Sequence, residues 1–304
     1  LESRTGSSMS RIEVIIVNYN AGDAIVRCVE SVLKQGEPLW LTVMDNASTD
    51  GSVGQLRERF GHLADVTVVD SGGNPGFAGA VNMAMQLQLK AGPESSPGEY
   101  LLILNPDCEM HDGALSKLAK ALEQEEEAAL AAPLVVDAAG KALRGTLRRF
   151  PDPWNSFVTF TGLWRLGRRH ESFSGVDISA ELPRSTCQAE AVSGACMLLK
   201  KSVFQAAGGM DEAYGLHCED LDLMYRLRRM GKHCLFVPSA VVYHEQGVSS
   251  RSRPVWVHWQ KHRGMQRFFQ KFQAGEYSFP LRWLVIAGIW TRFALTLPMQ
   301  LIRN

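Results

Sequence analysis

The chain has 304 residues, of which 45% are hydrophobic and 21% are charged, so it can bury a sizeable core and form one large domain with an appendage. Its formal net charge is zero, which argues against a general nucleic-acid-binding protein, and we expect no nucleic-acid partner. Residues 251–304 hold nine Lys or Arg and one acid, which leaves 23 basic and 31 acidic residues before them: a body of charge −8 and a tail of charge +8. This division favours a tail that meets an anionic surface.

The N-terminal residues and the cysteines indicate a cytosolic protein. Residues 1–10 are polar and lack the apolar run of a signal peptide, so we expect either a vector-derived remnant before Met9 or a disordered natural terminus. The six cysteines form no Cys-x-x-Cys pair and lie at no zinc-finger spacing from histidine, which predicts reduced thiols.

Four strand–helix units follow one another between residues 11 and 124. In each unit an apolar run predicts a buried strand, and apolar residues at helical spacing predict the helix behind it. The predicted strands are residues 12–17, 40–44, 66–69 and 100–104. Consecutive units of this kind predict an α/β fold with a doubly wound, mostly parallel central sheet flanked by helices.

The second half of the chain is less regular. A fifth apolar run covers residues 130–136, but residues 144–190 hold three prolines, several aromatics and no clean period. We interpret 144–190 as a substrate-facing or membrane-facing insertion, with an ordinary loop-rich connection as the alternative. A strand at 192–199, a helix at 218–231 and two short strands at 234–237 and 240–243 then lead to His244.

Polar, turn-prone residues come directly after each of the first four strands. They are residues 18–20, 45–50, 72–76 and 105–107. Because right-handed crossovers bring the carboxyl ends of parallel strands to one edge of a sheet, all four clusters should meet there and form a ligand site. Turn residues must lie somewhere in any fold, so the convergence alone fits plain connecting loops equally well.

Asp107 and His244 are the candidate metal ligands. An Asp after a strand is usually a cap or turn former, but Asp107 is joined by Asp45 on the same edge, by Asp220 at a helix start and by His244 after a strand. One Asp with one His is enough protein ligation for Mg²⁺ or Mn²⁺ that holds a diphosphate.

The loop at 72–76 is a candidate phosphate or sugar contact, through Asn74 and Gly76, because a glycine-rich turn that opens a helix brings backbone N–H groups close to a ligand. The loop is not Gly-x-Gly-x-x-Gly, and the chain has no Gly-Lys-Ser/Thr, so neither a Rossmann dinucleotide site nor a P-loop is supported.

Three acids open the helix at 218–231. Glu219, Asp220 and Asp222 can simply stabilise the helix start, and Asp222 can pair with Arg226 four residues on. The functional interpretation is that one of the three faces the cleft as a general base, within reach of a hydroxyl proton.

Six motifs of this chain stand in the order found in family 2 glycosyltransferases. They lie at residues 17–20, 45–51, 74–82, 104–107, 193–197 and 209–223. The chain therefore resembles this family over roughly residues 11–250, and within it bacterial rhamnosyltransferases that build cell-surface polysaccharides. Six ordered motifs are far more specific than any one of them.

The resemblance implies a GT-A fold and an inverting transfer from a nucleoside-diphosphate sugar. By motif position, Asp45 would accept a hydrogen bond from N3–H of uracil or thymine, with Asn18 and Asn20 near the nucleotide. Asn105 and Asp107 stand where the family often has Asp-x-Asp, so Asn105 replaces the first carboxylate on the nucleotide side and Asp107 would hold the metal.

The same resemblance implies that Asp220 is the catalytic base, that His244 is a second metal ligand and that Glu219 orients the acceptor or Asp220. We expect L-rhamnose to move from dTDP-rhamnose to a hydroxyl of a lipid-linked or polysaccharide acceptor, with a UDP-sugar as the alternative donor.

The tail, residues 251–304, is predicted to be helical. Residues 255–272 interleave aromatic and basic side chains, as a basic amphipathic helix does. Residues 283–302 are apolar for nearly a bilayer span, but Arg292 in their middle costs about 2.5–3.5 kcal/mol on insertion, which favours a helix in the membrane interface. The alternative is packing on the body or on a second copy in a homodimer. We expect a peripheral protein on the cytoplasmic face of the bacterial inner membrane.

Two other classes stay open. A nucleotidyltransferase has a similar sheet, but its first strand is followed by a loop rich in glycine and basic residues. In this chain the corresponding residues, 18–23, include one glycine and no Lys or Arg, which disfavours that class. In a non-catalytic nucleotide-sugar binder the predicted base, Asp220, would be dispensable.

Overall fold

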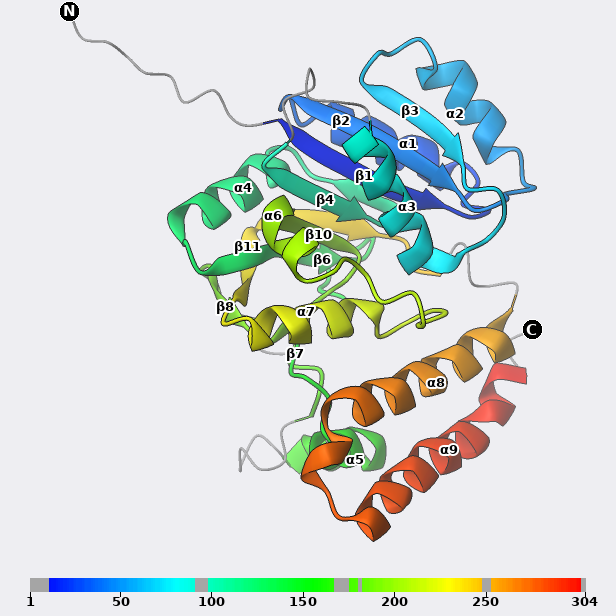
Figure 1. The fold of residues 1–304 in the computed structure, drawn as a ribbon, viewed down its shortest axis with the longest axis vertical. Coiled ribbons are helices and arrows are strands. Elements are labelled where there is room, and N and C mark those ends of the chain that lie inside the picture. The colour runs from blue at the N-terminus through cyan, green and yellow to red at the C-terminus, as the bar shows by residue number, and fades with distance from the viewer. Residues whose placement is uncertain (1–10, 91–97, 167–174, 180–181, 248–252, 302–304) are drawn as a thin grey trace, which may run out of the picture.

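The computed structural model describes residues 11–90, 98–166, 175–179, 182–247 and 253–301. The prediction for residues 1–10 lies outside this range. The described chain forms an α/β body with a helical layer at one end (Figure 1).

The body is built on one central sheet. Its spatial order is β3-β2-β1-β4-β10-β6-β11-β5, with β8 also paired to β11. The strands of this sheet are β1 (Ile12–Asn18), β2 (Leu39–Asp45), β3 (Val66–Asp70), β4 (Tyr100–Leu104), β5 (Cys108–Met110), β6 (Ala128–Val136), β8 (Cys187–Ala189), β10 (Cys196–Lys200) and β11 (His233–His244). The pairs β3–β2, β2–β1, β1–β4 and β6–β11 are parallel, whereas β10 runs antiparallel to β4 and β6.

Helices cover both faces of the sheet (Figure 1). The helices beside the sheet are α1 (Ala24–Leu33), α2 (Ser52–Phe60), α3 (Gly76–Lys90), α4 (Ala114–Gln124), α6 (Lys201–Ala206) and α7 (Glu219–Arg229). The layer at one end consists of α5 (Pro153–Thr161), α8 (Pro254–Phe272) and α9 (Phe279–Leu301), with short 3₁₀ helices η1 (Leu163–Leu166) and η3 (Ala274–Glu276). Side chains alternate along a strand, so Val14 and Ile16 pack toward α1, α2 and α4, whereas Ile15 and Val17 pack toward α3, α6 and α7. Burial on both faces explains why β1 is apolar except for Glu13, which pairs with Lys201, and Asn18 at its end.

The predicted α/β class and mostly parallel sheet are confirmed, but two strand predictions were wrong. Residues 234–237 and 240–243 belong to the single strand β11, whose register against β6 shifts between Val237 and Val241. Pro238 lies in that irregularity, where a missing N–H breaks no regular ladder bond.

The predicted strand at 192–199 is in fact two strands. β9 (Ala191–Val192) pairs with β7 (Leu147–Arg148) outside the main sheet, and β10 begins only at Cys196. The intervening turn at residues 193–195 carries Gly194, and this break is important for the site.

The tail forms two helices that pack on each other. α8 contacts α7 through Phe268 and Tyr225, whose ring centroids lie 5.5 Å apart. α9 folds back on α8, where the indole Nε1 of Trp290 donates to Oε1 of Gln266 at 2.7 Å. Figure 1 shows α5, α8 and α9 together at the end of the molecule away from α2. α9 is long and apolar enough to cross a membrane, and none of its described side chains is buried.

Candidate functional site

The loops after β1, β2 and β3 meet at one edge of the sheet, as the strand order predicts. Asn18 and Asp45 are register partners, and so are Asp45 and Asp70. Asn18 is fully buried, and its Nδ2 donates to Oδ1 of Asp45 at 2.9 Å and to Oγ of Ser52 at 2.8 Å. Asn18 therefore orients Asp45 and holds the β2–α2 loop from beneath.

Asp45 is 5% exposed at this edge. Its Oδ2 accepts from the backbone N–H of Ser48 at 3.0 Å, while Asn20 is tied to the same loop because its Oδ1 accepts from the N–H of Thr49 at 2.7 Å. Each carboxylate oxygen has a second lone pair, so the held carboxylate can still accept an N–H from a planar base.

The loop between β3 and α3 reaches the same edge. Oδ1 of Asn74 accepts from the N–H of Gly76 at 3.0 Å, and Asn46 bridges to this loop through its Nδ2, 3.2 Å from the Gly76 carbonyl oxygen. Gly76 has φ of +78°, a left-handed conformation that favours glycine. The N–H of Gly76 is thus engaged inside the loop, and the side chain of Asn74 is the exposed group.

Asp107 and His244 lie together beside the end of β4. Oδ1 of Asp107 is 3.0 Å from Nε2 of His244, and both side chains are mostly buried. Two adjacent ligands of an octahedral ion at about 2.1 Å lie roughly 3.0 Å apart, so this separation fits a small divalent cation. The carboxylate oxygen suits Mg²⁺ or Mn²⁺, and the imidazole nitrogen, a softer donor, favours Mn²⁺ of the two.

Cys108 is the third side chain in this group, with its Sγ within 4.8 Å of the other two ligand atoms. Burial, and then the charge of Asp107, raise the pKa of the Cys108 thiol well above its usual value. A protonated thiol is a poor ligand, so the carboxylate of Asp107 and the imidazole of His244 define the candidate metal centre.

Asp220 stands in the first turn of α7 and is paired with Arg148 of β7. Nη2 of Arg148 lies 2.5 Å from Oδ2 of Asp220, and the N–H of Leu221 donates to Oδ1 at 2.8 Å. Burial would raise the pKa of Asp220, but the charge and hydrogen bond of Arg148 outweigh it and hold that pKa below its usual value. Asp220 is therefore ionised at neutral pH, as a base must be.

Glu219 and Asp222, the neighbours of Asp220, have different environments. Burial, and then the charge of Asp220, raise the pKa of Glu219, which favours a protonated carboxyl. Asp222 is fully buried and pairs with Nε of Arg226 and Nζ of Lys271, each at 2.6 Å. The predicted pairing of Asp222 with Arg226 is confirmed, and Asp222 ties α7 to α8 away from Asp220.

The turn before β10 joins the candidate metal centre to Asp220. The carbonyl of Ala195 accepts from the N–H of Asn105 at 2.9 Å, which holds the half-buried Asn105 next to Asp107. A Cβ on Gly194 would lie 2.7 Å from both Cβ and Oδ2 of Asp220. Only glycine lets the backbone approach Asp220 this closely, so the break between β9 and β10 places Asp220 and Asn105 on one site.

Arg148 was not among the residues predicted from the sequence. It lies in the 144–190 segment, which has no period, and its contact with Asp220 spans 72 residues. The basic neighbourhood of Leu147–Arg148 gave no signal that one guanidinium would reach α7.

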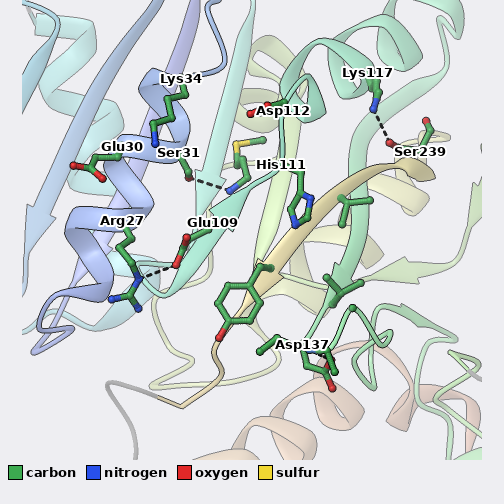
Figure 2. Close-up of a pocket in the computed structure, with 17 residues that line it drawn as sticks. Arg27, Glu30, Ser31, Lys34, Glu109, His111, Asp112, Lys117, Asp137 and Ser239 are labelled. Carbon is green, nitrogen blue, oxygen red and sulfur yellow. Dashed lines mark hydrogen bonds and ion pairs between the residues drawn. The ribbon is translucent and has the colours of Figure 1, made fainter.

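An open pocket of about 1130 Å³ lies elsewhere, between α1, β5, the start of α4 and residues 136–140 (Figure 2). None of the predicted site residues lines it. Tyr243 and Glu109 are register partners and line the pocket, whereas the next pair, His244 and Cys108, points to the other face of the strands. The pocket therefore lies behind the candidate metal centre, and its charges are mixed.

Comparison with known proteins agrees with this geometry. The sequence model of the family described as Glycosyl transferase family 2 matches residues 13–182. N-acetylglucosaminyl-diphospho-decaprenol L-rhamnosyltransferase of Mycobacterium tuberculosis is 27% identical over 96% of this chain and 95% of its own length. Rhamnosyltransferase WbbL of Escherichia coli K12 is 28% identical over 79% of this chain and 86% of its own.

A solved structure has the same fold. The mannosyltransferase PcManGT from Pyrobaculum calidifontis, in complex with GDP-Man and Mn²⁺, superposes with a TM-score of 0.57 over 98% of this chain and 73% of its own, at 19% identity. The predicted GT-A fold is thereby confirmed. Because the family match covers more than half of the sequence, the chain belongs to glycosyl transferase family 2 and is a glycosyltransferase.

Proposed function

We propose that this glycosyltransferase moves L-rhamnose from dTDP-rhamnose, with inversion, to a hydroxyl of a lipid-linked acceptor, in a reaction that depends on Mg²⁺ or Mn²⁺. The observation that carries the proposal is a pair of separate acidic centres joined through the turn before β10. One is Asp107 with His244, and the other is Asp220 with Arg148.

Asp107 and His244 would hold the cation, which neutralises charge on the diphosphate leaving group when it is bound. Asn105 directly follows β4, which pairs in parallel with β1, so it lies at the same strand end as Asn18. Asp45, oriented by Asn18, accepts the N3–H of the base, and Asn20 and Asn74 flank it. Gly76 shapes the loop that carries Asn74.

Asp220 takes the proton of the acceptor hydroxyl as the oxygen attacks the anomeric carbon. Its ionised state, held by Arg148, makes it ready to accept that proton. A single displacement from the face opposite the leaving group inverts the centre. Glu219, with its raised pKa, keeps a proton and acts as a neutral hydrogen-bond donor that positions Asp220 or the acceptor.

Rhamnose is favoured because the two rhamnosyltransferase relatives match most of the chain. A lipid-linked diphosphate acceptor is favoured by the name of the mycobacterial relative, which matches nearly full length. A UDP-sugar donor is the second candidate, since uracil offers the same N3–H to Asp45 as thymine. The nucleotidyltransferase alternative loses support, because the loop after β1 is occupied by Asn18 and Asn20 contacts to the β2–α2 loop.

A thermal-shift screen of dTDP, UDP and GDP, each with and without Mg²⁺ or Mn²⁺, tests the donor site. A ligand at a hundred times its dissociation constant stabilises the folded state by about 2.7 kcal/mol. We expect dTDP to stabilise the protein only with metal, and Asp107→Ala to remove that gain. Stabilisation by UDP instead would keep the family and change the donor. If none of the three nucleotides binds, the edge of the sheet is not a nucleotide-sugar site, and a non-catalytic protein that binds another ligand is favoured.

We also propose that residues 11–250 form the catalytic domain, with an acceptor-side insertion at 144–190, and that 251–304 attach it to the cytoplasmic face of the membrane. The support is the outer face of α9, where Phe279, Leu284 and Leu295 are 70, 67 and 63% exposed. Trp154 and Phe157 of α5 are also exposed, and α5 meets α9 where Arg292 lies over the ring of Phe160. Exposed apolar patches of this kind mark membrane or protein contacts.

Flotation with anionic and neutral vesicles tests the attachment. We expect the full chain to float with anionic vesicles, and Leu284→Ser combined with Leu295→Ser to weaken flotation. If the chain stays in solution and sediments as a dimer through α9, the surface is a subunit interface and the membrane proposal is wrong.

A further inference from the structure

Four basic side chains gather near Asp220, on the side of α5, α8 and α9. We call Arg144, Arg148, Lys261 and Arg292 the cationic cluster. Arg144 pairs with Asp177 at 3.0 Å, and Arg148 pairs with Asp220. In the part of the chain that the structure describes, no carboxylate forms an ion pair with Lys261 or Arg292.

Close packing of α8 places Lys261 next to the turn that leads into Asp220. A Cβ on Gly264 would lie 2.8 Å from the carbonyl oxygen of His217, and a Cβ on Gly215 would lie 2.5 Å from Nε2 of Gln260. Lys261 therefore stands between two residues of α8 that touch residues 215–217.

Arg292 of α9 reaches the same region from the other side. Its Nη1 lies 3.6 Å from Sδ of Met265, which is four residues after Lys261 and so shares its helical face. The guanidinium carbon is 5.8 Å from the ring centroid of Phe160 on α5. Among the described residues, Nε of Arg292 and Nε of Arg148 are buried and have no hydrogen-bond partner.

The electrostatics agree with this gathering of like charges. Lys261 is exposed as a residue, but desolvation of its ammonium group by nearby atoms, and then the charges of Arg292, Arg144 and Arg148, lower its pKa. The three guanidinium charges thus disfavour the charged form of Lys261, and a polyanion bound among the four side chains would relieve that repulsion.

We propose that the cationic cluster binds the diphosphate of a lipid-linked acceptor. This inference rests on the proposed function, since it assumes a sugar acceptor presented on a lipid diphosphate. The cluster lies between Asp220, which would meet the sugar hydroxyl, and the apolar surface of α5 and α9, which would meet the lipid. Along the protein, the catalytic base is followed by the cationic cluster and then by the apolar surface. Along the acceptor, the sugar is followed by the diphosphate and then by the lipid, so the two orders match.

The donor diphosphate has a separate place. Asp107 and His244 stand at the end of β4 and the end of β11, whereas the cationic cluster comes from residues 144–148, α8 and α9. Phosphate oxygens accept charge-assisted hydrogen bonds, which are among the stronger ones in proteins, and Lys261, an exposed residue, can donate them.

The test compares two synthetic acceptors, decyl N-acetylglucosaminide and the same sugar joined to the decyl chain through a diphosphate. We expect the wild type to have a kcat/KM about ten- to a hundredfold higher for the diphosphate acceptor. Lys261→Gln and Arg292→Gln should each remove about tenfold of that preference. Lys120→Gln, an exposed cation on α4, should leave the preference unchanged.

The donor KM separates the two sources of diphosphate. If the variants raise the KM of dTDP-rhamnose and keep the acceptor preference, the cluster serves the donor and the inference is overturned. Equal use of the two acceptors by the wild type would also overturn it.

Direct binding keeps the inference testable if no sugar is transferred to either acceptor, a result that would refute the proposed function. Binding of decyl diphosphate by calorimetry in EDTA avoids the metal centre. Weaker binding by both variants, with melting temperatures close to wild type, supports the cluster. Unchanged binding, or no binding by the wild type, contradicts it.

Discussion

Asp222 is expected to stabilise the fold and to take no part in catalysis, although it stands two residues after Asp220. It is fully buried and accepts hydrogen bonds from Arg226 and Lys271, so it fastens α8 to α7. Asp222→Asn keeps the size of the side chain and removes its charge.

The cost follows from the contacts that are lost. Two hydrogen bonds to charged groups are worth about 1.5–3 kcal/mol each. Arg226 keeps the carbonyls of Ala207 and Gly209, and Lys271 is about a third exposed and keeps Asp211, so both cations stay partly satisfied. We therefore expect a loss of about 2–4 kcal/mol, which lowers the melting temperature by roughly 4–10 °C.

Thermal unfolding by circular dichroism measures this loss, with Asp65→Asn, an exposed carboxylate, as the control. Turnover is then measured well below both midpoints, and we expect Asp222→Asn to stay within a few-fold of wild type. A variant that melts like wild type but has lost turnover would refute the reasoning, because Asp222 would then act in the reaction.

Three further predictions concern Glu219, Gly194 and Asp211. Glu219→Gln should keep turnover within about tenfold, since an amide resembles the protonated carboxyl that the raised pKa favours; steady-state kinetics check this. Gly194→Ala should lower kcat, because the added Cβ would displace Asp220. Its melting temperature should change little by comparison. Burial would raise the pKa of Asp211, but Lys271 and Arg267 outweigh it and lower that pKa to about 2. The stability that the ionised Asp211 contributes is therefore present above pH 4 and is lost as pH falls toward 2. Allowing for solvent screening, Asp211→Asn should remove about 1 kcal/mol at pH 7 and almost nothing at pH 2 in urea titrations.

The sheet and its functional edge could be predicted because their signals are local. Each buried strand ends in a run of turn residues, so the positions of Asn18, Asp45 and Asp107 follow from strand order and handedness. The pair Asp222 and Arg226 was predictable from helical spacing alone.

The remaining features depend on contacts between distant segments. The contact of Arg148 with Asp220 needs the small β7–β9 pair, which two-residue strands do not announce in the sequence. The prediction split β11 into two strands at Pro238, because a shift in register against β6 leaves no mark in the sequence of one strand. Lys261 reaches the site only because glycines at 215 and 264 let α8 approach closely.

The central claim is that Asp220 is the base of an inverting transfer. The most direct measurement is transfer from dTDP-rhamnose to the diphosphate acceptor by wild type and Asp220→Asn under saturating donor and metal, with the anomeric configuration of the product read by NMR. The account predicts inversion by the wild type and a fall in kcat of about a hundred- to ten-thousandfold in the variant, with donor binding preserved. Turnover near wild type in Asp220→Asn, or a product with retained configuration, would contradict it.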